Sequence, residues 1–201
     1  MDDIERIYEF IKTSEKLKSE MRHSWVSCGR NESVAEHSWR TSLMVMLISP
    51  FLKNKINTER ALRLAIIHDI VEMITGDTPY HQFDSSNYGR QQIKQSELEG
   101  AKKIKSVLPN LVGKEIFDLW FEFENLSSEE AKFVNALDKL EVCIQHAQSD
   151  CSTWLESERE SISPFINYLK GNCDSELILK TLEKLVISDL KTKHASEIKF
   201  K

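Results

Sequence analysis

The stretch LRLAIIHDIVEMITGDTPY, residues 62–80, decides how this chain folds, because it sets ionisable side chains in an apolar background. Its apolar residues recur at helical spacing, which predicts one largely buried helix over residues 58–76 that ends at a glycine. Glu72 would neighbour both His68 and Asp69 on that helix. Buried ionisable groups are costly unless they are paired or bind a metal, so the stretch predicts a salt-bridged face or a metal site.

Two other long predicted helices each carry one polar group within an apolar face. Residues 33–51 carry His37, and residues 127–147 carry Asp138. Together with the His68-Asp69 pair they give an H…HD…D pattern, which resembles that of the HD-domain metal-dependent phosphohydrolases. The resemblance implies an all-α fold, a single-domain bundle of helices around a metal site.

A closer resemblance rests on three runs: ESVAEH at 32–37, HDIVEMITGDTP at 68–79 and SSEEAKFVNALDKLE at 127–141. They resemble the small HD 5′-deoxynucleotidases, and the likeness extends over about residues 5–150. It implies one divalent metal, two catalytic carboxylates and a substrate contact through Arg22. The implied metal ligands are His37, His68, Asp69 and Asp138, and the implied catalytic residues are Glu72 and Asp77.

The segment KSEMRHSWVSCGRNES, residues 18–33, is predicted to be irregular and to form the lip of the site. A basic and aromatic loop beside a metal suits substrate binding, with Arg22 holding a phosphate and Trp25 stacking on a base. Trp25 could equally be a packing residue that covers the core. Ser33 and Glu36 have the spacing of a capping box, which gives Glu36 a structural role.

Two imidazoles and two carboxylates form a mixed donor set that suits Mn²⁺, Co²⁺, Fe²⁺, Ni²⁺ or Zn²⁺. Four protein ligands leave room for a water and a phosphate oxygen, so the expected reaction is attack of a metal-activated water on a (deoxy)nucleoside 5′-monophosphate. Glu72 and Asp77 would then handle protons at the attacking and leaving oxygens. Between the His68-Asp69 pair and Asp138, His81 is the one further histidine, which favours a mononuclear site.

The sequence leaves two other functions open. Another HD nucleotide hydrolase, acting on a nucleoside triphosphate or an alarmone, would keep the metal residues but would need more basic residues for the extra phosphates. A non-catalytic nucleotide-binding helical scaffold is disfavoured because Glu72 and Asp77 are both present. In a purely structural account, Glu72 would form a salt bridge to Arg63 or Arg40.

Composition agrees with a single helical domain over residues 1–201, with a core at about 5–150 and a C-terminal helical extension at about 160–190. The chain has only 6 Gly and 4 Pro for turns, and 40% hydrophobic residues, enough for an ordered core. With 27 basic and 32 acidic residues the formal charge is −5, which argues against binding duplex nucleic acid.

The expected compartment is the cytoplasm. The 4 cysteines lack CxxC spacing, and the start MDDIERIYEF lacks the basic and apolar regions of a secretory signal. No apolar run approaches the roughly 18 residues of a membrane span. The segment 109–126 has an aromatic face that would pack against the core or a partner subunit, which makes a homodimer an open arrangement.

Overall fold

The computed structural model describes residues 2–78 and 87–198, and this part of the chain is helical apart from one small hairpin. In chain order the elements are α1 (Asp3–Thr13), η1 (Ser14–Lys18), β1 (Met21–Trp25), β2 (Asn31–Ser33), α2 (Val34–Ile48), η2 (Ser49–Phe51), α3 (Thr58–Ile67), α4 (Glu72–Thr75), α5 (Asn87–Val107), α6 (Asn110–Glu124), α7 (Glu129–Gln148), η4 (Cys151–Thr153), α8 (Glu156–Glu160), α9 (Ser163–Leu169) and α10 (Leu177–Ile198). Elements marked η are short 3₁₀ helices. The expected all-α fold class is confirmed, with the hairpin as an addition.

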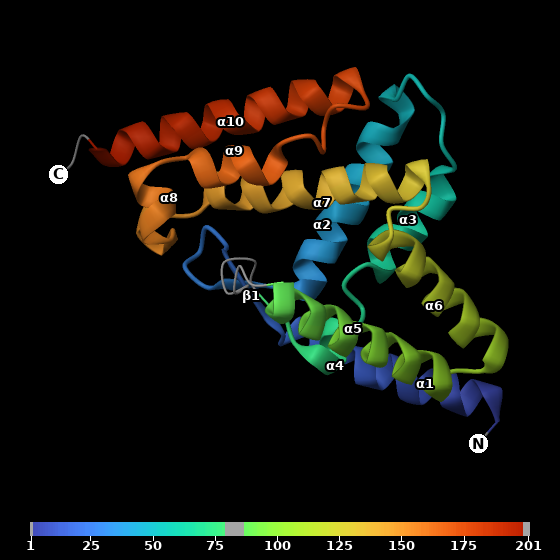
Figure 1. The fold of residues 1–201 in the computed structure, drawn as a ribbon. Helices are drawn as coiled ribbons and strands as arrows, with labels where there is room; N and C mark the ends of the chain where they lie inside the picture. The colour runs from blue at the N-terminus through green and yellow to red at the C-terminus, as the bar shows by residue number, and fades with distance from the viewer. Residues whose placement is uncertain (1, 79–86, 199–201) are drawn as a thin grey trace.

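Helix α7 is the centre of the bundle. It packs against α2, α3, α6, α9 and α10, and Figure 1 shows α9 and α10 running along one side of it. Its apolar face is fully buried at Leu137 and Leu140, because a helix surrounded by other helices must present apolar side chains on most of its surface. Asp138 therefore lies between two core residues, in the middle of the molecule.

The single helix predicted over residues 58–76 is wrong. Helix α3 ends at Ile67, a turn follows, and α4 begins only at Glu72. In the turn the backbone bonds become i→i+3, with the N–H of Ile70 donating to Ile67 at 3.0 Å and that of Glu72 donating to Asp69 at 3.0 Å. Adjacent residues on a regular helix point about 100° apart. His68 and Asp69 lie in this break, and their side chains nevertheless meet, with Nε2 of His68 3.1 Å from Oδ2 of Asp69.

Gly76 ends α4, as the sequence predicted. Its φ is +77°, a conformation that side chains other than glycine rarely adopt. The turn that follows is fastened to the start of the hairpin, because the N–H of Asp77 donates to Oε1 of Glu20 at 3.0 Å. The His68–Asp77 stretch is thus held at its C-terminal end. The loop expected after it, with His81, falls mostly on residues 79–86, which lie outside the described residues.

The lip predicted as irregular is an antiparallel hairpin, which corrects that expectation. β1 pairs with β2 in the register Met21↔Ser33 and Trp25↔Asn31, and the connecting turn contains Gly29 at φ +86°. β1 also packs on α7. The side chains of β1 are therefore carried by paired backbone rather than by a loose loop, and Ser33 and Glu36 form the expected capping box at the start of α2.

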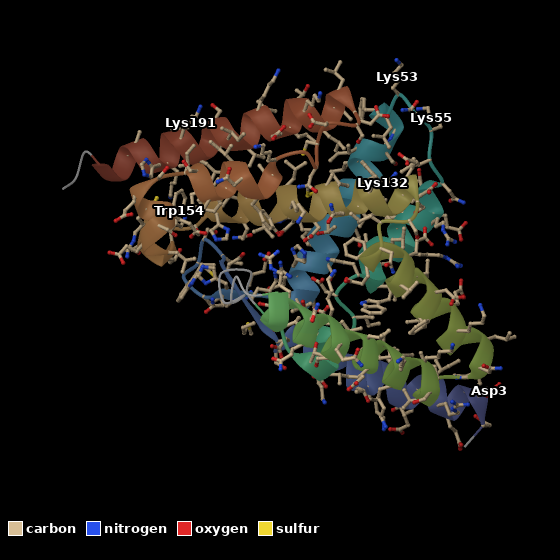
Figure 2. The ribbon with its side chains drawn as sticks, in the orientation of Figure 1. Asp3, Lys53, Lys55, Lys132, Trp154 and Lys191 are labelled. Atoms are coloured by element: carbon tan, nitrogen blue, oxygen red, sulfur yellow. The ribbon has the colours of Figure 1, made fainter. Side chains whose placement is uncertain are left out.

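The outside of the bundle is charged. Lys53, Lys55 and Lys191, labelled in Figure 2, lie at the outer edge of the molecule. Among the described residues, no helix combines the length and apolar character needed to cross a membrane. The bounds predicted for the domain and its C-terminal extension stay predictions; the core as described continues from Met44 on α2 to Leu190 on α10.

Candidate metal centre

His37 lies in the first turns of α2 and is completely buried. Its Nδ1 is 2.5 Å from Oε2 of Glu141 on α7. Since an ionised carboxylate can only accept a hydrogen bond, Nδ1 carries the hydrogen and donates it. The other ring nitrogen, Nε2, faces the centre of the site and keeps a lone pair when the ring is neutral.

His68 presents the same nitrogen to the same place. Its Nδ1 donates to the backbone carbonyl of Ala65 at 2.8 Å, which again leaves Nε2 with a lone pair in the neutral ring. The Nε2 atoms of His37 and His68 are 3.2 Å apart. Two lone pairs this close repel each other unless a proton or a cation lies between them. The arrangement therefore fits a bound cation.

Two carboxylates complete the convergence. Oδ2 of Asp69 is 3.1 Å from Nε2 of His68 and 3.6 Å from Nε2 of His37, and Oδ1 of Asp138 is 3.0 Å from Nε2 of His37. Adjacent ligands of an ion with bonds of about 2.1 Å lie about 3 Å apart. The structure thus brings together all four residues predicted as metal ligands, as two imidazole nitrogens and two carboxylate oxygens.

Electrostatics also favour a positive charge at this point. Burial and the Arg22 charge lower the pKa of His37, but the carboxylates of Glu141 and Asp138 outweigh them and raise it to about 10. Burial, reinforced by the charge of Asp69, raises the pKa of Glu72 to about 10. Without a metal, His37 and Glu72 would therefore hold protons at neutral pH. A bound divalent ion can take the place of such protons.

A cavity of about 200 Å³ opens beside these ligands. Arg22, Glu72 and Asp77 line it together with Asp69 and Asp138, so the structure gathers three further predicted residues around one space. Nη1 of Arg22 donates to Oδ2 of Asp69 at 2.9 Å. Oε2 of Glu72 is buried and has no hydrogen-bond partner among the described residues. A polar atom in that state is costly and is therefore a candidate for contact with water or a ligand.

The structural alternative for Glu72, a salt bridge to Arg63 or Arg40, is wrong. Arg40 donates to Oε1 of Glu141 at 2.6 Å, and Arg63 pairs with Glu59 and Glu115. Both arginines that the structural alternative names are engaged elsewhere. Glu72 therefore faces the cavity without either of the salt bridges that the alternative requires.

Trp25 is placed differently from Arg22. It is not among the described residues that line the cavity, and its backbone carbonyl accepts a hydrogen bond from Nε2 of Gln145 at 2.6 Å. That bond anchors the hairpin to α7. The expectation that the Trp25 ring stacks on a base stays a prediction.

The sequence reasoning missed the layer of residues that holds the ligands in place. Glu141 and Arg40 form the chain His37–Glu141–Arg40, and Glu32 lies beside it with a pKa that burial and the Glu141 charge raise to about 7. A signal was present: Glu141 follows Asp138 by three residues, and Arg40 follows His37 by three. Residues at this spacing share a helix face.

The cavity also receives side chains from parts of the chain that carried no motif. His23 follows Arg22 on β1, His146 lies near the end of α7, and Tyr168 comes from α9. None belongs to the H…HD…D pattern. Their positions depend on the packing of β1 and α9 against α7, which periodicity alone does not give.

Comparison with known proteins agrees with this geometry. A model of the HD domain family matches residues 14–177. The human protein named 5′-deoxynucleotidase HDDC2 is 31% identical over 181 residues, covering 89% of this chain and 84% of that protein. The Schizosaccharomyces pombe 5′-deoxynucleotidase hdd1 is 33% identical over 145 residues, covering 69% and 70%. A crystal structure from Magnetospirillum magnetotacticum, described as a predicted metal-dependent phosphohydrolase, superposes with a TM-score of 0.76 at 24% identity, covering 95% of both chains, and so shares the fold. On the family match and these identities, the chain belongs to the HD domain family.

Proposed function

We propose that this protein is a metal-dependent phosphohydrolase that removes phosphate from (deoxy)nucleoside 5′-monophosphates. The observation that carries the proposal is the convergence of two imidazole nitrogens and two carboxylate oxygens beside a cavity lined by an arginine and two further carboxyl groups. The human and Schizosaccharomyces pombe relatives, both named 5′-deoxynucleotidase, support the substrate class.

The metal would be held by His37, His68, Asp69 and Asp138. The mixed donor set favours a divalent transition ion of the series Mn²⁺ to Zn²⁺ over Mg²⁺ or Ca²⁺, which prefer oxygen ligands alone. A bound ion of this kind supplies Lewis-acid chemistry, acidifying water and offsetting negative charge on a phosphoryl group. The hydrogen bonds from His37 to Glu141 and from His68 to Ala65 fix both rings in the orientation that this role needs.

Arg22 would bind the substrate phosphate. Its guanidinium lies at the cavity wall, 2.9 Å from Asp69, and its side chain is only 13% exposed. A guanidinium presents several N–H donors in a plane and can hold one carboxylate while donating to phosphate oxygens. Arg22 is also the one arginine or lysine among the described residues that line the cavity. A single fixed cation suits a monophosphate better than a triphosphate.

Glu72 and Asp77 would move protons. Both line the cavity, and burial raises the pKa of each carboxyl above its ordinary value. A carboxyl with a raised pKa can hold or release a proton near neutral pH, as general acid–base catalysis requires. One of the two would take the proton of the attacking water and the other would protonate the leaving 5′ oxygen. Their presence at the cavity favours an enzyme over a non-catalytic scaffold.

A nucleotide panel tests this function. The protein is stripped with a chelator, supplied in turn with Mn²⁺, Co²⁺, Fe²⁺, Ni²⁺ or Zn²⁺, and assayed for phosphate release from deoxynucleoside and ribonucleoside mono- and triphosphates. We expect turnover that depends on the added ion and is fastest on 5′-monophosphates. Faster release from triphosphates would instead support another HD nucleotide hydrolase, and no release from any nucleotide would support a binding scaffold.

A homodimer and a cytoplasmic location stay predictions. The aromatic face of α6 is mostly used inside the chain, since Trp120 and Phe123 are buried in the core, while Phe121 is 50% exposed. We infer that any dimer contact through α6 would centre on Phe121. Light scattering of the wild-type protein and of Phe121→Ser would test it: a dimer mass lost in the variant supports the contact, and a wild-type monomer contradicts it.

A further inference from the structure

A second group of potential ligands lies at the same cavity but shares no residue with the first centre. His23, His146 and Glu158 each offer one ligand atom, and these atoms all lie within 4.8 Å of one another. They come from three elements, β1, α7 and α8. His146 and Glu158 are buried, and His23 and His146 line the cavity. The group therefore borders the cavity through His23 and His146.

His146 is oriented as a ligand would be. Its Nδ1 donates to the backbone carbonyl of Val142 at 2.8 Å, so the neutral ring keeps its lone pair on Nε2. Burial lowers the pKa of His146, which keeps the imidazole neutral at neutral pH. Metal-binding histidines commonly donate their second ring nitrogen to a carbonyl or carboxylate in this way. His37 and His68 show the same arrangement at the first centre.

Glu158 and the backbone around His146 are fixed by the packing of α8. Oε2 of Glu158 accepts the N–H of Leu155 at 2.9 Å, which ties one carboxylate oxygen to the start of the helix. Nε1 of Trp154 donates to the carbonyl of His146 at 3.1 Å, and Figure 2 shows Trp154 where α8 and α9 approach α7. The ring of Phe165 lies 5.1 Å from that of His146. These contacts hold Glu158 and His146 in place.

The two groups are far enough apart for separate ions. Asp138 and His146 are eight residues apart on α7, which corresponds to about 12 Å along a helix that rises about 1.5 Å per residue. The two residues share a side of the helix, and both line the cavity. An ion at each end would therefore face the same space.

We propose that His23, His146 and Glu158 form a second metal site, for a divalent transition ion such as Zn²⁺ or Co²⁺. Two imidazoles and one carboxylate are a donor set that zinc uses when a coordination position is left open. Here the open position would face the cavity, through which a water or a donor atom of a small ligand could reach it. The inference concerns binding and stands whether or not the proposed reaction does.

Metal stoichiometry tests the second site. Tag-free protein is stripped with a chelator, titrated with Co²⁺ by calorimetry, and analysed for bound cobalt after gel filtration. We expect two equivalents in the wild type and one in His146→Gln and in His23→Asn. Glu158→Gln keeps an oxygen for the N–H of Leu155 but loses the charge, so it should bind the second ion at least roughly 10-fold more weakly. His194→Asn, at a histidine outside the group, should keep two equivalents.

The outcomes separate this site from others. One equivalent in the wild type overturns the proposal. A second equivalent that survives in His23→Asn and His146→Gln but disappears in Glu72→Gln also overturns it, because that ion would be bound by carboxylates at the other end of the cavity. Since His146 is buried, its variant could misfold; His23→Asn on the hairpin then decides. In wild-type crystals soaked with Co²⁺, an anomalous peak is expected between the three side chains, and its absence contradicts the proposal.

Discussion

Two groups of side chains at the cavity differ in their hydrogen bonding. The four predicted metal ligands form the ligand side, and Arg22, Glu72 and Asp77 form the facing side. On the ligand side, Nδ1 of His37 donates a hydrogen bond to Glu141 and Nδ1 of His68 donates one to the carbonyl of Ala65, so each ring is fixed. On the facing side, Glu72 keeps a buried oxygen without a hydrogen-bond partner among the described residues, and Asp77 lies at the cavity with a raised pKa. A fixed, satisfied set is suited to binding an ion. Unsatisfied carboxyl groups are suited to exchanging protons.

The largest effect is expected on the ligand side. His68→Ala and Asp138→Ala should both lose bound metal, and phosphate release should fall to background, because the remaining ligands cannot hold the ion and are left unsatisfied. Metal analysis and phosphate release on the same preparations check this. Full metal occupancy in either folded variant would remove that residue from the ligand set.

A smaller effect is expected for Glu141, which contacts the ligand His37 and would not contact the metal. Glu141→Ala should weaken metal binding by roughly 10–100-fold, since it removes the partner that orients His37. Glu141→Gln is the matched control, because its side-chain oxygen can still accept from Nδ1 of His37, and it should bind metal more tightly than Glu141→Ala. Competition with a chromogenic chelator measures both affinities. Equal affinities in the two variants and the wild type would show that His37 needs no support.

On the facing side, Arg22→Ala should raise KM for a nucleoside 5′-monophosphate by roughly 10-fold, the lower end of what a hydrogen bond to a charged group contributes. Arg22→Lys should recover part of this, because it restores the charge without the planar group. Since Arg22 also contacts Asp69, metal content is measured in each variant. An unchanged KM with full metal content would take Arg22 out of substrate binding.

The smallest effect is a pH dependence of the metal-free protein. The pKa of His37 is raised from 6.5 to about 10 and that of Glu72 from 4.5 to about 10, so the folded state holds protons that the unfolded state has released. The His37 contribution to stability is complete below pH 6.5 and is lost as the pH rises towards about 10. Over the same pH range Glu72 is protonated in the folded state and ionised in the unfolded state. Folding therefore costs more free energy at Glu72 as the pH rises.

Both terms have the same sign, so the Tm of the stripped protein should fall between pH 6.5 and 9.5. Saturating metal should raise the Tm and reduce this slope, and Glu72→Gln should make the slope shallower in the stripped protein, leaving the part that comes from His37. Thermal melting across the pH range checks the prediction. A Tm of the stripped wild type that rises with pH would contradict the assigned proton positions.

The sequence singled out the four residues that converge, because the polar groups stand out on periodic apolar helix faces and match the H…HD…D resemblance. His37 and Asp138 interrupt apolar faces of α2 and α7, and both reach the place where those helices meet α3. The break after Ile67 could not be predicted, since the apolar spacing of residues 62–74 continues through it. The break begins at His68, whose Nδ1 donates to the carbonyl of Ala65 three residues earlier.

The hairpin and the cavity positions of His146 and Tyr168 were harder to predict, because long-range contacts determine them. The hairpin is stabilised by the bond from Gln145 to the carbonyl of Trp25, two residues 120 positions apart. Tyr168 reaches the cavity through the packing of α9 on α7. Such contacts leave no local pattern, so the positions of Arg22 and His23 on a strand could not be read from the sequence.

The central claim is that Glu72 serves the reaction and not the metal or the fold. Metal content, Tm and kcat measured on one preparation of Glu72→Ala test it most directly. The account predicts full metal occupancy, a near-native Tm at neutral pH and a kcat reduced by roughly 10²–10⁴-fold, as expected for a lost general acid–base group. A folded, metal-loaded variant with near wild-type kcat would contradict the account.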